Sequence, residues 1–331
     1  MRNPYLLSSL ALITMLIVSL AIGSVFIPPA ELWRVVTGTS SSDIFPTILW
    51  NIRLPRTVLI ALVGAALAGS GAAYQGLFRN PLADPYLIGV ASGAGLGAII
   101  AMSIRWPYTT LGLFAVPLAA FIASLLTVYL VYTFAQIGRT VPTTNLILAG
   151  VAVSSFTVSL TSFVMLRSSG EVRRAIGWLL GGVSLVGWDV TLALVPYLAV
   201  GMTSLILTGY SLNLLQFGDD QATQMGLNVR RAKFFIIIAS SLVTAAAVSF
   251  AGIIGFIGLI VPHIVRIWWG VDYRRLIPLS ILGGASVLLV ADVLSRIVLA
   301  PEELPVGIVT ALAGAPFFLW VLRRAKNQGF W

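Results

Sequence analysis

Long apolar runs fill most of the chain, and short polar breaks rich in proline, glycine or arginine separate them. A helix needs about 20 mainly apolar residues to cross a bilayer. Ten runs approach or reach this length, and they are centred near residues 16, 67, 96, 123, 154, 198, 241, 263, 286 and 314. The pattern therefore predicts an all-α integral membrane protein with about ten transmembrane helices.

Two of these runs are less regular than the rest. The first, residues 5–27, exceeds the roughly 7 to 15 residues of a secretion-signal core and precedes nine others, which favours a retained helix. The eighth, residues 256–269, is short and follows the glycines of GIIGFIG. A count of nine spans would move the C-terminus to the other side of the membrane, so the predicted topology depends on this run.

Composition supports a membrane protein without an appended soluble domain. Of the 331 residues, 58% are hydrophobic and 9% are charged, whereas soluble domains carry about 25% charged residues. The mean hydropathy is +0.99 and comes from the whole length of the chain. We therefore expect a single transmembrane domain over residues 1–331.

The residue types that most catalysis requires are scarce. The chain has no cysteine and one histidine, His263, so thiolate chemistry, histidine metal centres and Ser-His-Asp machinery lack their side chains. Its two lysines, Lys233 and Lys326, lie outside any GxxxxGK(S/T) pattern, so we expect no P-loop for ATP. The chain is predicted to be non-enzymatic and to hold no metal or cofactor of its own.

Basic residues are spread between the apolar runs. Lys and Arg number 20 against 11 Asp and Glu, a net charge of +9, but they form no basic face of the kind that binds nucleic acid. With ten spans and an internal N-terminus, 12 basic residues fall inside and eight outside, and the clusters at 230–233 and 323–326 both fall inside. This bias favours cytoplasmic N- and C-termini and contact with anionic membrane lipid, with no nucleic acid.

Two short turns on the predicted cytoplasmic side contain proline. In FRNPLADPYLIG, residues 78–89, Asn80 ends one span and Asp84 has the form of an N-cap for the next helix. In RTVPTTNLILAG, the hydroxyls of Thr143 and Thr144 either cap a helix or constrict a pathway that two copies share. Periodicity leaves both interpretations open.

The longest cytoplasmic connection, residues 211–233, is predicted to form two short helices joined by a glycine turn. Asp219 and Asp220 precede a short helical stretch, and Gly226 is placed to end it. An interfacial amphipathic loop is the alternative, but an acidic pair suits an anionic membrane surface poorly. A protein partner is the better interpretation.

Three arginines gather near the predicted outer surface. Arg53 and Arg56 lie directly before the second span, where Pro55 stiffens the approach, and Arg296 lies at the outer end of the ninth span. They are either snorkelling anchors or a docking patch for an acidic partner, because arginine pairs bidentately with carboxylates. Asp292 lies four residues before Arg296, which favours a structural intramembrane pair over a proton relay.

Five segments, spread between residues 53 and 322, carry a family resemblance that extends over nearly the whole chain. They are RLPRT at 53–57, RNPLADPYLIGVASGAGLGA at 79–98, LILAGVAVS at 146–154, GFIGLIVPHIVR at 255–266 and ELPVGIVTALAGAPFFLWVL at 303–322. They resemble the permease subunits of bacterial ABC importers for iron-siderophores, haem and vitamin B12, the FecCD-type or type II importers.

The resemblance implies a homodimer in the bacterial cytoplasmic (inner) membrane. Two cytoplasmic ATPase subunits would bind ATP and magnesium, and an extracytoplasmic solute-binding protein would deliver the substrate. Cytoplasmic gates are implied at Asn80 and Leu82, together with Thr143 and Thr144.

The resemblance also assigns contacts with these partners. A coupling-helix segment at about 211–230 would seat in the ATPase. The coupling residues are implied to be Asp219, Asp220, Gln221, Ala222, Thr223, Met225 and Gly226. Arg53, Arg56 and Arg296 match arginines that receive glutamates of the binding protein.

The implied activity is ATP-driven import of a metal chelate by alternating access, with an iron-siderophore first and haem or cobalamin next. An ion-gradient-driven secondary transporter is the alternative. Such proteins usually place ionisable groups or broken helices at the midplane, and only Asp292 comes close here. An intramembrane enzyme would need a catalytic constellation that the composition does not supply.

Overall fold

The computed structural model describes residues 3–40, 42, 44–104, 106, 110–138, 140–167, 172–183 and 187–326. Within them all named elements are helices, and one isolated β-bridge joins Ile137 to Thr140. Each of the ten predicted runs contains one main helix. These are α1 (Pro4–Ala21), α4 (Leu54–Leu77), α5 (Val90–Met102), α6 (Thr110–Ala135), α7 (Thr143–Arg167), α9 (Trp188–Leu207), α12 (Val229–Ala251), α13 (Ile257–Trp269), α14 (Tyr273–Ile297) and α15 (Val306–Lys326).

Length and composition divide these helices into two groups. In the described residues, seven helical stretches are long and apolar enough to cross a membrane. Three apolar helices are shorter, namely α5, α13 and the 306–321 part of α15. The all-α membrane class is therefore confirmed.

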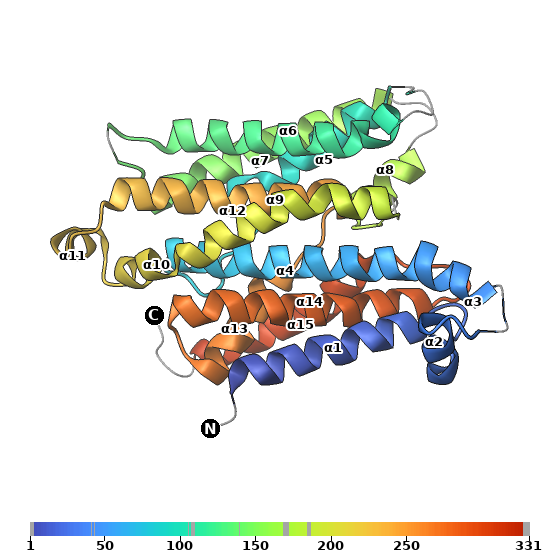
Figure 1. The fold of residues 1–331 in the computed structure, drawn as a ribbon. Coiled ribbons are helices and arrows are strands. Elements are labelled where there is room, and N and C mark those ends of the chain that lie inside the picture. Colours follow the sequence, from blue (N-terminus) through green and yellow to red (C-terminus); the bar gives the residue numbers. More distant parts are fainter. Residues whose placement is uncertain are drawn as a thin grey trace.

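Short elements lie at the two ends of the bundle. The remaining elements are α2 (Pro29–Val36), α3 (Ile44–Thr47), the π-helical η1 (Ile48–Arg53), the 3-10 turn η2 (Pro85–Ile88), α8 (Val172–Leu179), α10 (Gly209–Leu215) and α11 (Asp219–Gln224). Figure 1 shows the long helices running side by side, with α2, α3 and α8 at one end and α10 and α11 at the other, where α1 also begins. We refer to these as the α2 end and the α11 end.

Helix α4 is the centre of the packing. Its membrane-crossing window is 83% buried, and α14, α12, α13 and α9 surround it. At its crossing with α14, a Cβ on Gly64 would lie 2.3 Å from the backbone oxygen of Gly284, and a Cβ on Gly284 would lie equally close to Gly64. Small residues at such a crossing let two backbones touch, which is how membrane helices gain packing energy.

The start of the second span differs from the sequence prediction. We expected a short stiffened approach before the helix, but residues 44–77 form one continuous helical stretch through the π-helical turn. The Leu54 N–H donates to Leu49 O, five residues earlier, and Pro55 follows at the first turn of α4, where its missing N–H costs little. Arg53 and Arg56 consequently lie on a helix, not in a loop.

Two helices are interrupted inside the bundle. α5 and α13 each contain 13 residues, about 20 Å of helix, which is shorter than a hydrocarbon core of about 30 Å. Non-helical backbone continues them, and the two breaks meet where the Tyr86 hydroxyl donates to Ile254 O at 2.8 Å and accepts from Ile254 N at 3.3 Å. Such backbone is tolerated at membrane depth because the protein itself satisfies it.

Candidate functional site

Arg53 is a buried cap on the end of α1. Its side chain is 5% exposed, and Nη1 donates to Leu20 O at 2.7 Å and to Ala21 O at 3.0 Å. Nη2 donates to Val25 O. The last carbonyls of a helix lack partners within the helix, so this guanidinium satisfies them and fixes the chain that leaves α1.

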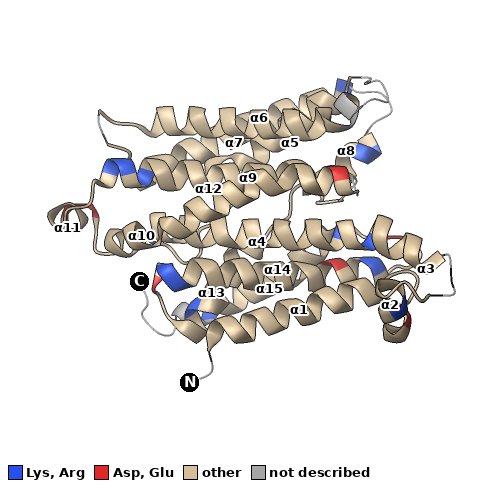
Figure 2. Cartoon of the chain, viewed as in Figure 1, with Lys and Arg blue, Asp and Glu red and all other residues tan. Residues whose placement is uncertain are grey.

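Asp292 lies between Arg56 and Arg296, and Figure 2 shows basic parts of α4 and basic and acidic parts of α14 towards the α2 end. The Asp292 carboxylate is fully buried; Oδ1 lies 3.0 Å from both Nε and Nη2 of Arg56, and Oδ2 lies 3.0 Å from Nη2 of Arg296. Arg296 also donates to Ser19 Oγ at 2.9 Å. The structure therefore joins α1, α4 and α14 through one carboxylate, and includes the (i, i+4) pair that we expected to be structural.

Glu303 completes this charge network and was missed by the sequence analysis. Its Oε2 lies 2.6 Å from Nη1 of Arg56, and its side chain is 43% exposed whereas that of Arg56 is 13% exposed. Glu302 and Glu303 are the only carboxylates between the ninth and tenth runs, and that isolated pair could have marked Glu303 as a candidate, but not which arginine it pairs with. We call Arg53, Arg56, Asp292, Arg296 and Glu303 the outer charge network.

The four predicted gate residues fall on two segments. Asn80 and Leu82 lie in the turn after α4, where Asn80 Oδ1 accepts from Leu82 N at 2.9 Å. Thr143 and Thr144 begin α7, the first half-buried and the second exposed. In the described residues no hydrogen bond joins one pair to the other.

Helix α7 lies against the segment that follows this turn. A Cβ on Gly150 would be 2.1 Å from Leu87 O, so the α7 backbone touches η2 directly. Most of α7 is nevertheless open, since 17% of its membrane window is buried.

The open face of α7 is polar along part of its length. Ser155, Ser159 and Ser162 are exposed, and each hydroxyl donates to the carbonyl four residues earlier, at 2.9, 2.9 and 3.0 Å. Their spacing of four and three residues places them on one side of the helix. Large apolar side chains, among them Phe156, Phe163 and Leu166, are exposed beside them, so the open side of α7 is mixed in polarity.

The predicted coupling segment is a helical hairpin at the α11 end (Figure 1). α10 and α11 are separated by Gly218 with φ 100°, and Gly226 with φ 88° follows α11. Asp219 starts α11 and its carboxylate accepts from Nζ of buried Lys233 on α12. Of the other predicted coupling residues, Ala222 is buried, and the exposed ones are Asp220, Gln221, Thr223, Met225 and Gly226.

A second polar link connects the hairpin to α14. Asn213 on α10 donates to Asp272 Oδ1 at 2.6 Å and accepts from Tyr273 N at 2.8 Å. Asp272 also caps α14 by accepting from Arg274 N. These hydrogen bonds, that of Asn213 first, lower the pKa of the Asp272 carboxyl below its usual value.

The single histidine packs against an aromatic ring and, within the described residues, does not belong to a group of possible metal ligands. His263 stacks edge-on against Phe317, with ring centroids 6.3 Å apart. Among the residues that the structure describes, no group of three or more His, Asp or Glu side chains is placed to hold a metal ion.

The chain belongs to the FecCD transport family, whose profile matches residues 11–324. It is 40% identical over 327 residues to the hemin transport system permease protein of Yersinia pestis, covering 96% of both chains. It is 41% identical over 333 residues to an uncharacterized ABC transporter permease protein of Bacillus subtilis, covering 98% of this chain and 94% of that one. The family resemblance in the sequence is thereby confirmed.

Two further matches agree with this assignment. The chain is 38% identical over 322 residues to the vitamin B12 import system permease protein of Klebsiella pneumoniae, covering 97% of this chain and 93% of that one. A solved metal-chelate type ABC transporter in an inward-facing conformation superposes with a TM-score of 0.85 at 28% identity, over 97% of this chain and all of the other. The protein is a multi-pass membrane permease of the ABC transporter class.

Proposed function

We propose that this chain is the permease subunit of an ATP-driven importer that carries a metal chelate into the bacterial cytoplasm by alternating access. It would form one transmembrane domain with ten spans, cytoplasmic N- and C-termini and a location in the inner membrane. Its partners would be a second copy, two ATPase subunits that bind ATP and magnesium, and an extracytoplasmic binding protein. The chain itself would hold no cofactor.

The open serine face of α7 carries this proposal. The exposed side of α7 combines three hydroxyls with apolar side chains, a mixture that fits an interface enclosing a pathway better than lipid on every side. Placing α7 opposite the same helix of a second copy would enclose such a pathway between two identical faces. Thr144 begins this face, and Thr143 and Thr144 with Asn80 and Leu82 would narrow the pathway at its cytoplasmic end.

The hairpin at the α11 end is evidence for a separate ATPase subunit. Asp220, Gln221, Thr223 and Met225 project from it, while Asp219 and Asn213 fasten it to α12 and α14. An ATPase that binds the exposed side of the hairpin would move α12 and α14 through these hydrogen bonds and ion pairs. Deletion of residues 219–226 is expected to abolish ATPase assembly, and retained assembly would refute this role.

The α2 end is the proposed docking surface for the binding protein. Arg53 and Arg296 are bonded inside the protomer, so Arg56 and its partner Glu303 are the members of the outer charge network that a docking partner could reach. Arg56→Gln is expected to weaken capture of the binding protein, whereas Arg34→Gln on α2, whose arginine already pairs with Glu31 at 2.6 Å, is the matched control. Equal capture by the wild type and both variants would restrict the outer charge network to a structural role.

The relatives named above carry hemin and vitamin B12, and haem, cobalamin and ferric siderophores are the cargo classes that we propose to compare. These chelates differ in visible absorption, so the spectrum of material co-purified with the binding protein would distinguish them. Reconstitution in proteoliposomes tests the energy source. Accumulation is expected with ATP and the ATPase, and accumulation on a proton or sodium gradient alone would favour a secondary transporter instead.

A further inference from the structure

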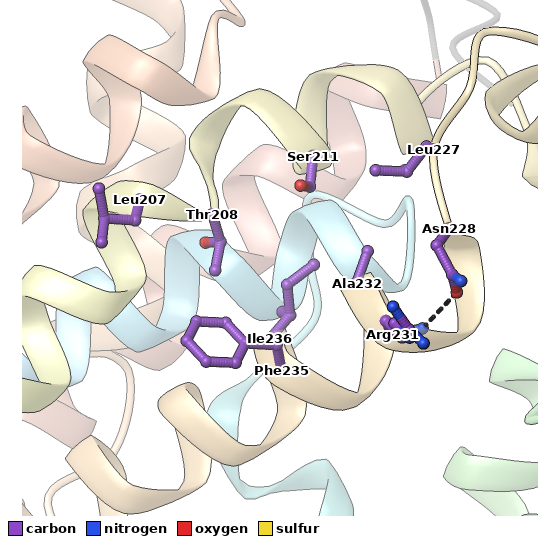
Figure 3. Close-up of a pocket in the computed structure, with 9 residues that line it drawn as sticks. All are labelled: Leu207, Thr208, Ser211, Leu227, Asn228, Arg231, Ala232, Phe235 and Ile236. Atoms are coloured by element: carbon purple, nitrogen blue, oxygen red, sulfur yellow. Dashed lines mark hydrogen bonds between the residues drawn. The ribbon is translucent and has the colours of Figure 1, made fainter.

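A cavity of about 380 Å³ lies beside the coupling hairpin, between the end of α9 and the start of α12. Figure 3 shows Leu207 and Thr208 on one side of it and Arg231 and Phe235 on the other. Leu207 is 72% exposed and Phe235 is 51% exposed, and both lie within apolar membrane-crossing helices. The mouth of the cavity therefore opens where the spans meet the membrane surface at the α11 end.

The cavity lining is apolar on one part and rich in hydrogen-bond donors on another. Leu207, Phe235 and Ile236 supply hydrocarbon surface. Arg231, Asn228 and Ser211 supply a guanidinium, an amide and a hydroxyl, and no carboxylate lines the cavity. An amphiphile with a negatively charged head group matches both parts at once.

The donors of this cavity are not used elsewhere in the described structure. Asn228 Oδ1 accepts from the backbone N–H of Arg231 at 3.0 Å. The Asn228 side chain therefore caps the first turn of α12. Within the described residues, the Arg231 guanidinium, Asn228 Nδ2 and Ser211 Oγ make no hydrogen bond, and Arg231 forms no ion pair. Lys233 differs, because Asp219 already neutralises it.

We propose that this cavity binds an acidic phospholipid of the adjoining leaflet, with its phosphate on Arg231 and Asn228 and an acyl chain along Leu207 and Phe235. Basic pockets between membrane helices on the cytoplasmic side are a recurrent form of anionic-lipid site, and the net charge of the cytoplasmic leaflet favours the same occupant. The lipid touches both the residue that ends α9 and the first turn of α12. It consequently bridges the two points where the coupling hairpin leaves and re-enters the bundle.

Native mass spectrometry of the purified full-length protein tests this site directly. The protein would be exposed to equal amounts of phosphatidylglycerol and phosphatidylcholine, as wild type, as Arg231→Gln and as Arg230→Gln. Arg230 is exposed and adjacent but does not line the cavity, so it is the matched control for net charge. Arg231→Gln is expected to weaken phosphatidylglycerol binding about fivefold, and Arg230→Gln is expected to leave it within about twofold.

Each other outcome overturns the proposal. Equal retention of the two lipids would show that the head-group charge does not determine binding. Equal losses in the two arginine variants would show diffuse attraction rather than a site. Displacement of the lipid by excess inorganic phosphate would assign the cavity to the free anion. Phe235→Ser supplies an independent check, because it should weaken phosphatidylglycerol binding without changing charge.

Discussion

Helices α1 and α7 are equally open but expose different chemistry. In each, 17% of the membrane-crossing window is buried within the chain. The open face of α1 presents Leu6, Leu10, Ile13 and Ile17, whereas that of α7 includes Ser155, Ser159 and Ser162. An exposed fraction alone thus does not say what a helix faces. The side chains differ, and on the function proposed above they place α1 against lipid and α7 at a hydrated interface.

The two helices are also held in different ways. α1 is fastened at the α2 end by charged side chains, since Arg53 caps its last carbonyls and Arg296 bonds to Ser19. α7 is held by close backbone contact, since Gly150 touches Leu87.

The largest expected effect comes from removing the carboxylate that holds the network around α1. Asp292→Ala leaves the guanidiniums of Arg56 and Arg296 without their shared buried partner. Breaking a buried ion pair from one side typically costs about 3–5 kcal/mol, so the variant should unfold at a much lower temperature in detergent. Asp292→Asn, which keeps the volume and an acceptor, should lose less, and equal melting of all three proteins would show that the network does not hold α1.

The second-largest effect is expected from an arginine placed at the centre of each open face. It should affect α1 and α7 differently. Arginine at a lipid-facing helix centre costs about 2.5–3.5 kcal/mol on insertion scales. Ile13→Arg should therefore reduce the amount of folded, membrane-inserted protein. Ser155→Arg should leave that amount near the wild-type level because its neighbours are hydrated, and equal losses for the two variants would contradict the distinction.

The contact that seats α7 gives a smaller effect. Gly150→Ala forces a Cβ against Leu87 O, and overpacking of this kind costs about 1–3 kcal/mol. Transport should fall together with stability because α7 must shift. Gly177→Ala is the control, since its Cβ would meet nothing within 4 Å. A transport rate unchanged by Gly150→Ala would mean that this contact does not position α7.

The exposed edge of the outer charge network should matter least for folding. Glu303→Gln leaves Arg56 paired with Asp292, and exposed ion pairs contribute about 0–1 kcal/mol. Its melting temperature should stay close to that of the wild type. A loss as large as that of Asp292→Ala would show that Glu303, rather than Asp292, is the main partner of the arginines.

Positions of the ten main helices could be predicted because apolar runs and their polar breaks are local properties of the sequence. The short helical stretch beginning near Asp219 and the glycine that follows it could be predicted for the same reason. The pairing of Arg56 with Glu303 could not, because 247 residues separate them. Nor could the continuous helix through Arg53, because the π-helical turn before Pro55, with its Leu54 N–H to Leu49 O hydrogen bond, has no signature in the sequence.

Thiol labelling tests the central claim most directly, since the chain contains no cysteine and single cysteines can be introduced without background. Ser155→Cys and Ile13→Cys place a thiol at the middle of α7 and of α1, and a charged, water-soluble thiosulfonate reacts only with a hydrated thiol. The account predicts rapid labelling at residue 155 and almost none at residue 13 in membrane vesicles. Labelling at equal rates, or at residue 13 alone, would contradict the assignment of α7 to the pathway.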